Sequence, residues 1–475
     1  MTFDTSSLSD AYLVDEEIIV NELLSLADPG PDQRHDIKQL ATQLVNKVRE
    51  NIDELDGIDA FMQEYDLSSK EGILLMCLAE ALLRIPDKST ADKLIKDKIL
   101  DADWKSHLGK SDSLFVNAST WGLMLTGRII DIDVSKKGMS KAMDKFINKT
   151  GEPVIRTGLL RAMEMMGKQF VMGRTIKEAL NRGKKKGFKK YRFSYDMLGE
   201  AALTQEDADR YYQSYEDAIH AIAEANKKRH INDASSISIK LSALHPRYEL
   251  ANTERVMSEL APRVLSLVQQ AKNHNVAVTI DAEEADRLEL SLKVFADVYR
   301  QLEDYEGFGL VVQAYQKRAL DVLKLLISLV QEGGRLIPLR LVKGAYWDTE
   351  IKLAQEQGLS HYPVYTRKAN TDLAYLACAR LLLANRDKFY PQFATHNANT
   401  VAAIYTMAGD QGGYEFQRLH GMGQPLHNQT IAEDGLNRPC RVYAPVGSHQ
   451  DLLPYLVRRL LENGANTSLD RKSVV

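Results

Sequence analysis

The 475-residue chain is 44% hydrophobic, so it can bury a large core, and it is too long for one average domain. Its net charge of −4 excludes a general electrostatic attraction to nucleic acid. The cysteines Cys77, Cys378 and Cys440 are too far apart for a disulfide framework or a CxxC metal pair, which indicates a reducing compartment such as the cytoplasm.

The first part of the chain is predicted to be helical and without catalytic residues. Residues 1–23 form an acidic arm that lacks the basic start of a signal peptide, and Pro29-Gly30-Pro31 then breaks the chain. Residues 24–100 are assigned to a helical domain, because Ser68 and Glu71 resemble a capping box in front of an apolar helix. Residues 101–145 are assigned to a linker. The longest apolar run, residues 72–83, is too short to span a bilayer, so membrane contact can only be peripheral.

Residues 146–475 are predicted to form a (β/α)8 barrel of the TIM type. Strand-like runs alternate with helical patterns, which is typical of parallel βα units. The runs are Phe193–Asp196, Ser236–Lys240, Ala277–Asp281, Gly309–Gln313, Pro338–Val342, Gln392–His396, Phe416–His420 and Arg441–Tyr443. The helical patterns between them include Asp207–Asn226, Thr253–Lys272, Glu284–Leu302, Ala319–Val330, Thr371–Ala384 and Thr400–Met407. The predicted fold class is therefore α/β, with an all-helical domain in front of the barrel.

Most of the predicted strands end in polar residues. These residues, at or just beyond the carboxyl ends, are Asp196, Lys240, Asp281, Gln313, Lys343, His396 and His420. The carboxyl ends of barrel strands converge on one mouth, where the active sites of TIM barrels lie. Packing alone does not explain so many polar ends, so the sequence predicts an active site at this mouth.

Several common kinds of site find no support. The chain has no GxGxxG after a strand, no GxxxxGK[ST], no GxSxG and no HExxH. His396 and His420 make only a weak metal pair, so no metal site is predicted. The basic run Gly183–Arg192 is interpreted as a solvated loop, because its few cations accompany an acidic chain. No nucleic-acid partner is predicted.

The remaining candidates are cationic and planar. Tyr455, Arg458, Arg459 and Glu462 share one face of the last predicted helix, where two arginines can form a fork for a carboxylate; the alternative is a solvated basic stripe. Cations at Lys240, Arg340, Lys343, Arg367 and Lys368 can meet anions, and Gln313, Tyr315, Tyr346, Trp347 and Tyr443 can flank a flat ring. This set suits a flavin and a small acid substrate. Two alternatives stay open: a flavin-free lyase with Lys240 as a Schiff-base nucleophile, and a regulatory or scaffold protein with an inactive barrel.

Several long motifs run through the barrel. They are FSYDMLGEAALT (193–204), ISIKLSALHPRYE (237–249), TIDAEEADRLELSL (279–292), VVQAYQKR (311–318), RLVKGAYWD (340–348), YPVYTRK (362–368), FATHNANT (393–400), FQRLHGMG (416–423) and the stretch 441–468. Together with CLAEALLRIPDK (77–88), they resemble the proline dehydrogenase domain of the proline utilization A family over roughly residues 25–468.

The resemblance implies a distorted barrel that holds FAD at its carboxyl-terminal mouth. It further implies oxidation of L-proline to Δ1-pyrroline-5-carboxylate by hydride transfer to the flavin N5, the first step of proline catabolism to glutamate, with a membrane quinone as electron acceptor. We therefore expect a cytoplasmic enzyme with peripheral contact at the inner membrane. Full-length members of the family carry an aldehyde dehydrogenase half that this chain lacks, and residues 1–22 lack the pattern of a ribbon-helix-helix DNA-binding segment.

The resemblance also implies residue roles. Arg458 and Arg459 resemble the pair that clamps the proline carboxylate, with Lys240 and Glu462 as supports. Asp281, Tyr346, Leu419, Tyr443 and Tyr455 resemble the remaining walls, and Tyr443 would favour proline over hydroxyproline. Arg340 resembles the residue near flavin N5, and the other FAD contacts are Gln313, Val342, Lys343, Gly344, Trp347, Thr366, Arg367, Lys368, Thr395 and His396. Arg340, Lys240 and Asp281 are the catalytic candidates; a structural role for Asp281, bonded to Lys240, is the alternative to proton transfer.

Overall fold

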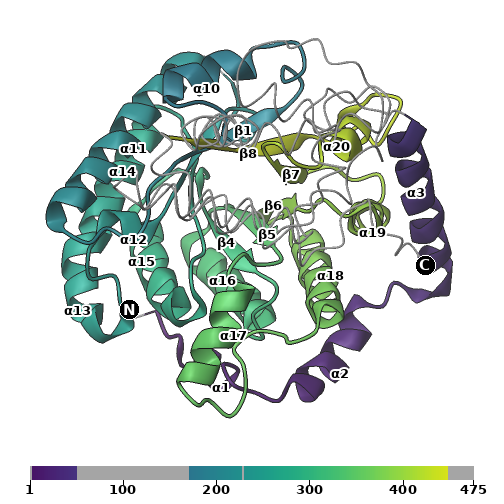
Figure 1. Ribbon diagram of the computed structural model, residues 1–475, viewed down its shortest axis with the longest axis horizontal. Coiled ribbons are helices and arrows are strands. Elements are labelled where there is room, and N and C mark those ends of the chain that lie inside the picture. The colour runs from purple at the N-terminus through teal and green to yellow at the C-terminus, as the bar shows by residue number, and fades with distance from the viewer. Residues whose placement is uncertain (1–2, 51–170, 227–228, 448–475) are drawn as a thin grey trace, which may run out of the picture. The chain divides into compact units, whose positions relative to one another are not determined.

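The computed structural model describes residues 3–50, 171–226 and 229–447. Within these residues the strands pair in parallel and in sequence order, and β8 pairs back to β1, which closes a barrel. The strands are β1 (Arg192–Met197), β2 (Ser236–Ile239), β3 (Val278–Ile280), β4 (Phe308–Gln313), β5 (Ile337–Val342), β6 (Phe389–Ala394), β7 (Glu415–Leu419) and β8 (Cys440–Val446). Figure 1 shows helices around this barrel. The predicted (β/α)8 barrel is confirmed, with strand limits shifted by a few residues.

The helices outside the barrel follow the predicted order. They are α10 (Ile176–Gly183), α11 (Gln205–Asn226), α12 (Leu241–Leu244), α13 (Thr253–Arg255), α14 (Ala261–Asn273), α15 (Leu288–Gln301), α16 (Ala319–Gly333), α17 (Trp347–Glu356), α18 (Lys368–Ala384), α19 (Ala398–Ala408) and α20 (Gln424–Ile431). A π-helical turn, Val256–Leu260, joins α13 to α14 inside the predicted helix Thr253–Lys272. Pro262 has no N–H to donate to that turn, which accounts for the irregularity. The short helices α12, α17 and α20 are not among the predicted elements, because short helices leave little periodicity.

Alternate residues of the strands face the barrel interior, and many of them are polar. On β1, the Ser194 hydroxyl lies 3.0 Å from that of Ser238 on β2. The neighbouring positions, Phe193 and Tyr195, instead stack on each other with ring centroids 5.7 Å apart. The two-residue period of a strand thus places hydroxyls and charges inside the barrel and apolar rings on its other face.

The N-terminal segment lies along the outside of the barrel. Its helices are α1 (Ser6–Asp10), α2 (Glu16–Ala27) and α3 (Gly30–Glu50), drawn in purple in Figure 1. Leu23 and Ala27 of α2 pack on α18 at Ala374 and Ala377, and the middle of α3 packs on α19. The boundaries of the helical domain and linker stay predictions, because residues 51–170 lie outside the described part of the chain. Among the described residues, no helix is long and apolar enough to cross a membrane.

Candidate active site

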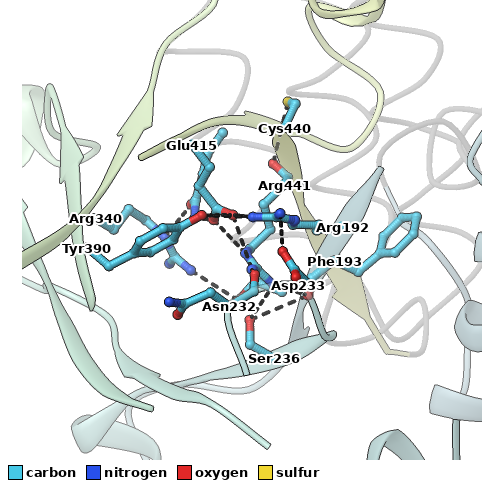
Figure 2. Close-up of polar contacts among 12 residues, drawn as sticks. Arg192, Phe193, Asn232, Asp233, Ser236, Arg340, Tyr390, Glu415, Cys440 and Arg441 are labelled. Atoms are coloured by element: carbon cyan, nitrogen blue, oxygen red, sulfur yellow. Dashed lines mark hydrogen bonds and ion pairs between the residues drawn. The ribbon is translucent and has the colours of Figure 1, made fainter. Parts of the chain in front are cut away.

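A buried carboxylate holds two arginines near the amino ends of the strands. Glu415, the first residue of β7, accepts hydrogen bonds from Nε and Nη2 of Arg441 at 2.6 and 3.1 Å, and from Nη1 of Arg192 at 3.0 Å. Figure 2 shows these three side chains turned toward one another. Burial would raise the pKa of Glu415, but the two guanidinium groups lower it below its ordinary value. We call Arg192, Glu415 and Arg441 the lower layer; residues at this end of a TIM barrel serve stability.

Gln417 connects the lower layer to Arg340. The amide Nε2 of Gln417 donates to Glu415 Oε1 at 3.0 Å, and its Oε1 accepts Nε of Arg340 at 2.7 Å. The Arg340 guanidinium also donates to the hydroxyls of Ser194 and Ser238 at 3.1 and 3.0 Å. All five side chains are buried, so these hydrogen bonds fix the guanidinium in one orientation.

Asp281 lies directly after β3 and pairs with two cations. Its Oδ1 accepts Nη1 of Arg340 at 2.8 Å, while Oδ2 accepts the hydroxyl of Tyr443 at 2.6 Å and lies 3.5 Å from Nζ of Lys240. Lys240 Nζ also donates to Asp196 Oδ1 at 2.7 Å. We call Asp196, Lys240, Asp281, Arg340 and Tyr443 the mouth layer. Its two carboxylates balance its two cations, and both oxygens of Asp281 are engaged.

The mouth layer keeps Lys240 charged. Burial would lower the pKa of this ammonium, but Asp196, Tyr443 and Asp281 raise it well above its ordinary value. A Schiff-base lysine must lose its proton before it attacks a carbonyl, so this environment opposes the lyase alternative. Burial and the same two carboxylates also raise the pKa of Tyr443 well above its ordinary value, which keeps its hydroxyl a donor.

Three of the predicted FAD contacts gather at the start of α18. Lys343, just after β5, and Lys368, the first residue of α18, both pair with Asp372. Arg367 is exposed and directly precedes the helix. Cationic side chains at a helix N-terminus, where backbone N–H groups also point outward, are suited to a phosphate.

The loop after β5 passes close to an aromatic ring. Gly344 has φ +139°, and a Cβ on it would lie 2.5 Å from the Tyr315 ring, so only glycine allows this approach. Tyr346 precedes α17, and Trp347, its first residue, is 38% exposed. The Trp347 indole donates to the Tyr365 carbonyl at 2.9 Å, which fixes a flat, accessible side chain beside the glycine loop.

The remaining predicted contacts lie at other strand ends. Gln313 and Val342 are paired in register at the ends of β4 and β5, and Gln313 Oε1 accepts Gln316 Nε2 at 2.7 Å. Leu419 ends β7 in register with Tyr443 of β8. Their strand-end positions agree with the predicted mouth.

Two more predicted contacts, Thr395 and His396, follow β6. The Thr395 hydroxyl accepts the Asn397 N–H at 3.1 Å, and His396 Nε2 accepts the Leu419 N–H at 3.1 Å. His396, which follows β6, therefore binds the backbone at the end of β7. In the described part of the chain, no group of three or more His, Cys, Asp or Glu residues could hold a metal ion.

Four predicted pocket residues, Tyr455, Arg458, Arg459 and Glu462, lie outside the described residues, so the carboxylate fork stays a prediction. The structure does bring together Lys240 and Asp281, directly after β2 and β3, with Arg340 of β5 and Tyr443 of β8. The Arg340 guanidinium also lies over the Tyr443 ring, 5.1 Å from its centroid.

Several residues that hold this site were not predicted from the sequence. They are Ser194, Ser238, Asp372, Gln417 and Glu16, and Asp196 was noted only as a strand end. Polar residues at alternate positions, as in Ser194 and Asp196 or Glu415 and Gln417, were a usable signal for the interior. Glu16 carried no such signal, because its partners lie about 350 positions away in the chain.

Three family models match the chain. The model described as proline dehydrogenase matches residues 179–472. A model described as the DNA-binding domain of proline dehydrogenase matches residues 57–170, and one described as the proline utilization A proline dehydrogenase N-terminal domain matches residues 6–49. Residues 57–170 lie outside the described part of the chain, and the absence of a nucleic-acid partner stays a prediction.

Curated relatives agree with these matches. The bifunctional protein PutA of Escherichia coli is 53% identical over 477 residues, which cover 98% of this chain and 36% of that protein. PutA of Rhizobium meliloti is 51% identical over 468 residues, covering 97% of this chain and 38% of that protein. The chain thus spans little more than a third of the length of these relatives. Proline dehydrogenase 1 of Bacillus subtilis is 29% identical over 313 residues, covering 65% of this chain and 90% of that protein.

Solved structures of proline utilization A proteins are also similar to this chain. Proline utilization A of Bradyrhizobium japonicum superposes with a TM-score of 0.74 at 46% identity, over 98% of this chain and 47% of that one. The Bdellovibrio bacteriovorus protein inactivated by N-propargylglycine superposes with a TM-score of 0.64 at 26% identity, over 90% of this chain and 42% of that one. Because the proline dehydrogenase model matches more than half of the residues, the chain belongs to the proline dehydrogenase family of enzymes.

Proposed function

We propose that this chain catalyses the FAD-dependent oxidation of L-proline to Δ1-pyrroline-5-carboxylate. The observation that carries the proposal is the mouth layer, in which buried Lys240 and Arg340 are each held by a carboxylate at the active end of the barrel. A zwitterionic amino acid needs fixed charges of this kind to bind in one orientation. Membership of the proline dehydrogenase family supports the reaction class.

The residues present fit FAD. Lys343, Arg367 and Lys368 bring cations to the start of α18, where they would hold the phosphates. The backbone at Gly344 approaches the Tyr315 ring in a way that a Cβ would prevent, and exposed Trp347 offers a flat surface for a ring. A flavin cofactor is therefore the proposal that accounts for these features together.

When bound, FAD supplies a hydride acceptor. Arg340, fixed by Asp281, Gln417 and two serine hydroxyls, keeps a positive charge at the mouth that stabilises negative charge developing there. Lys240 stays protonated and supports binding of the substrate carboxylate, which Arg458 and Arg459 are predicted to clamp.

Asp281 is better suited to positioning than to proton transfer. Both of its oxygens are engaged, by Arg340 on one side and by Tyr443 and Lys240 on the other. Because both oxygens already accept hydrogen bonds or face a cation, we assign the amine proton to water. Of the two roles that the sequence left open for Asp281, this assignment favours the structural role over proton transfer.

The wider setting is also proposed from the family resemblance. We infer that the electrons pass to a membrane quinone, that the enzyme works in the cytoplasm with peripheral contact at the inner membrane, and that an aldehyde dehydrogenase half accompanies it in the whole protein. Reduction of a ubiquinone analogue by the proline-reduced enzyme, compared with reduction of molecular oxygen, tests the acceptor.

The test of the main proposal is an anaerobic absorbance spectrum before and after L-proline is added. We expect flavin bands that bleach with L-proline and do not bleach with D-proline. Bands that persist would contradict the substrate, and no bands after incubation with FAD would contradict the cofactor. Borohydride with an aldehyde or ketone substrate serves as the control for the lyase alternative, and we expect no trapping at Lys240, because its ammonium stays protonated.

A further inference from the structure

The N-terminal arm reaches the cofactor end of the barrel at Glu16, the first residue of α2. The Glu16 carboxylate accepts the Thr366 backbone N–H at 2.9 and 3.1 Å, the Thr366 hydroxyl at 2.8 Å and the Asn370 amide at 2.6 Å. Thr366 lies just before α18, and Asn370 lies in its first turn. One carboxylate from the start of the chain thus binds both the loop and the helix that carry the predicted phosphate contacts.

Helix α18 has no cap of its own. Its N-cap residue, Arg367, makes no side-chain capping bond, and in the first turn only its backbone carbonyl is seen to accept, from the Asn370 N–H at 3.0 Å. Glu16 binds the backbone just before the helix, through the Thr366 N–H, and the Asn370 amide in its first turn. Glu16 also stands in the first turn of α2, so the positive ends of two helix dipoles meet at its carboxylate. Burial would raise the pKa of Glu16, but the hydrogen bonds from Thr366, Asn370 and the Arg367 backbone lower it below its ordinary value.

Within the described residues, the loop in front of α18 is also held by Trp347, whose indole donates to the Tyr365 carbonyl, and by a pairing with residues 315–317. Residues 363–365 pair with residues 315–317: the Tyr365 N–H donates to the Tyr315 carbonyl at 2.9 Å, and the Lys317 N–H donates to the Pro363 carbonyl at 3.2 Å. The Lys317 ammonium in turn donates to the Val14 carbonyl at 2.7 Å. The arm therefore holds both segments of this pairing, one through Val14 and the other through Glu16.

We propose that Glu16 is a positioning residue for the cofactor: it fixes the loop before α18 so that Thr366, Arg367 and Lys368 can hold FAD. This inference rests on the proposed function, because it takes FAD as the ligand of that loop. Glu16 contacts Thr366, which would touch the cofactor, and Asn370 in the first turn of the same helix. Its removal should therefore weaken FAD binding and leave the proline site, which lies at the mouth layer, unchanged.

The test is the affinity of the deflavinated full chain for FAD, measured by isothermal titration. Glu16→Gln keeps the side-chain length and one acceptor oxygen but loses the charge and the second acceptor. We expect its FAD dissociation constant to rise on the order of tenfold, the loss typical of a charge-assisted hydrogen bond. Glu17→Gln is the matched control: Glu17 is the next residue of α2, is exposed, and carries the same charge at the same helix end. We expect its dissociation constant to stay within about twofold of wild type.

Several outcomes would overturn the inference. Equal affinity in Glu16→Gln and wild type would show that the contact does not position the loop. Tighter binding would show that Glu16 repels the phosphates of FAD, and equal losses in both variants would assign the effect to net charge. Wild-type protein that takes up no FAD would instead overturn the proposed function, so the two failures are distinguishable.

A second variant covers the case in which Glu16→Gln fails to fold. Asn370→Ala removes one partner of Glu16 and leaves its charge, and we expect a loss of FAD affinity in the same direction but smaller, about threefold. The thermal midpoint of each deflavinated variant is the folding control. A variant whose deflavinated form melts like wild type while FAD binds more weakly supports positioning; unchanged FAD affinity in folded Asn370→Ala contradicts it.

Discussion

The lower layer and the mouth layer are built from the same kinds of residue, arginine or lysine paired with a buried carboxylate. Arg441 of the lower layer and Arg340 of the mouth layer differ in what else holds the guanidinium. Arg441 in the lower layer donates to the backbone carbonyls of Phe193, Ala234 and Asn232 at 3.2, 2.7 and 2.6 Å, besides Glu415 (Figure 2). Arg340 in the mouth layer donates to side chains, those of Asp281, Gln417 and two serines.

We infer that the backbone contacts of Arg441 serve stability and that the side-chain contacts of Arg340 serve catalysis. A cation tied to the backbone of β1 and of the segment before β2 holds strands together, and its loss exposes buried carbonyls without partners. A cation that donates only to side chains holds a charge in place, and the strands stay paired when that cation is replaced. We therefore expect the same conservative substitution to act on folding in one layer and on catalysis in the other.

The largest effect is expected for Arg441→Lys. The ammonium can keep its pairing with Glu415 but cannot reach the three carbonyls as well, so we expect the free energy of unfolding to fall by roughly 3 kcal/mol. Urea unfolding measures it. The rate of flavin reduction by proline, per bound flavin, should stay within about twofold of wild type, because Arg441 is linked to Arg340 indirectly, through Glu415 and Gln417. A stable Arg441→Lys variant with slow flavin reduction would reverse the assignment of the lower layer.

Arg340→Lys is the matching change in the mouth layer. Lysine keeps the charge beside Asp281 but loses the fixed orientation that Gln417 and the serine hydroxyls provide. We expect the rate of flavin reduction to fall on the order of a hundredfold, as for other losses of preorganised charge, and the free energy of unfolding to fall by only about 1 kcal/mol. Stopped-flow absorbance and urea unfolding of the same preparation check both values. If stability fell more than in Arg441→Lys, the contrast between the layers would not hold.

The sequence predicted the barrel and much of its mouth for a simple physical reason. Alternating strands and helices identify parallel βα units, and polar strand ends such as Lys240 and Asp281 stand out against apolar runs. The resemblance to the proline utilization A family added residue roles that periodicity does not contain. The substrate fork at Arg458 and Arg459 stays a prediction, because those residues lie outside the described part of the chain.

What the sequence could not predict depends on contacts between distant positions. The pairing of Arg340 with Gln417, or of Glu415 with Arg441, follows from barrel closure and register, which strand patterns alone do not fix. The docking of α2 on α18 is more remote still, since Glu16 and Thr366 are 350 positions apart. An acidic N-terminal arm looks like a solvated segment until its partner helix is known.

In the lower layer, the pH dependence of the free energy of unfolding gives an effect of intermediate size. The pKa of Glu415 is lowered below its ordinary value of 4.5, so its contribution to stability is present above pH 4.5 and is lost as the pH falls through the lowered pKa. Glu415→Gln has no such proton to bind. Below pH 4.5, wild-type stability should therefore decline more steeply than that of the variant, by at most about 1.4 kcal/mol per pH unit. Parallel stability profiles from pH 6 to pH 3 would contradict this assignment.

The smallest effects are expected at Tyr443, where two substitutions separate its ring from its hydroxyl. Tyr443→Phe keeps the ring under the Arg340 guanidinium but removes the donor to Asp281. Tyr443→Ser removes the ring as well and opens space beside the substrate. If Tyr443 discriminates by its bulk, kcat/KM for proline relative to hydroxyproline should be retained in Tyr443→Phe and should narrow several-fold in Tyr443→Ser, since steric rejection of one hydroxyl is worth only about 1–3 kcal/mol. If the preference for proline over hydroxyproline narrows in Tyr443→Phe, the Tyr443 hydroxyl and its hydrogen bond to Asp281 discriminate between the two substrates. The hydrogen bonds of the mouth layer, and not the space beside the substrate, would then determine specificity.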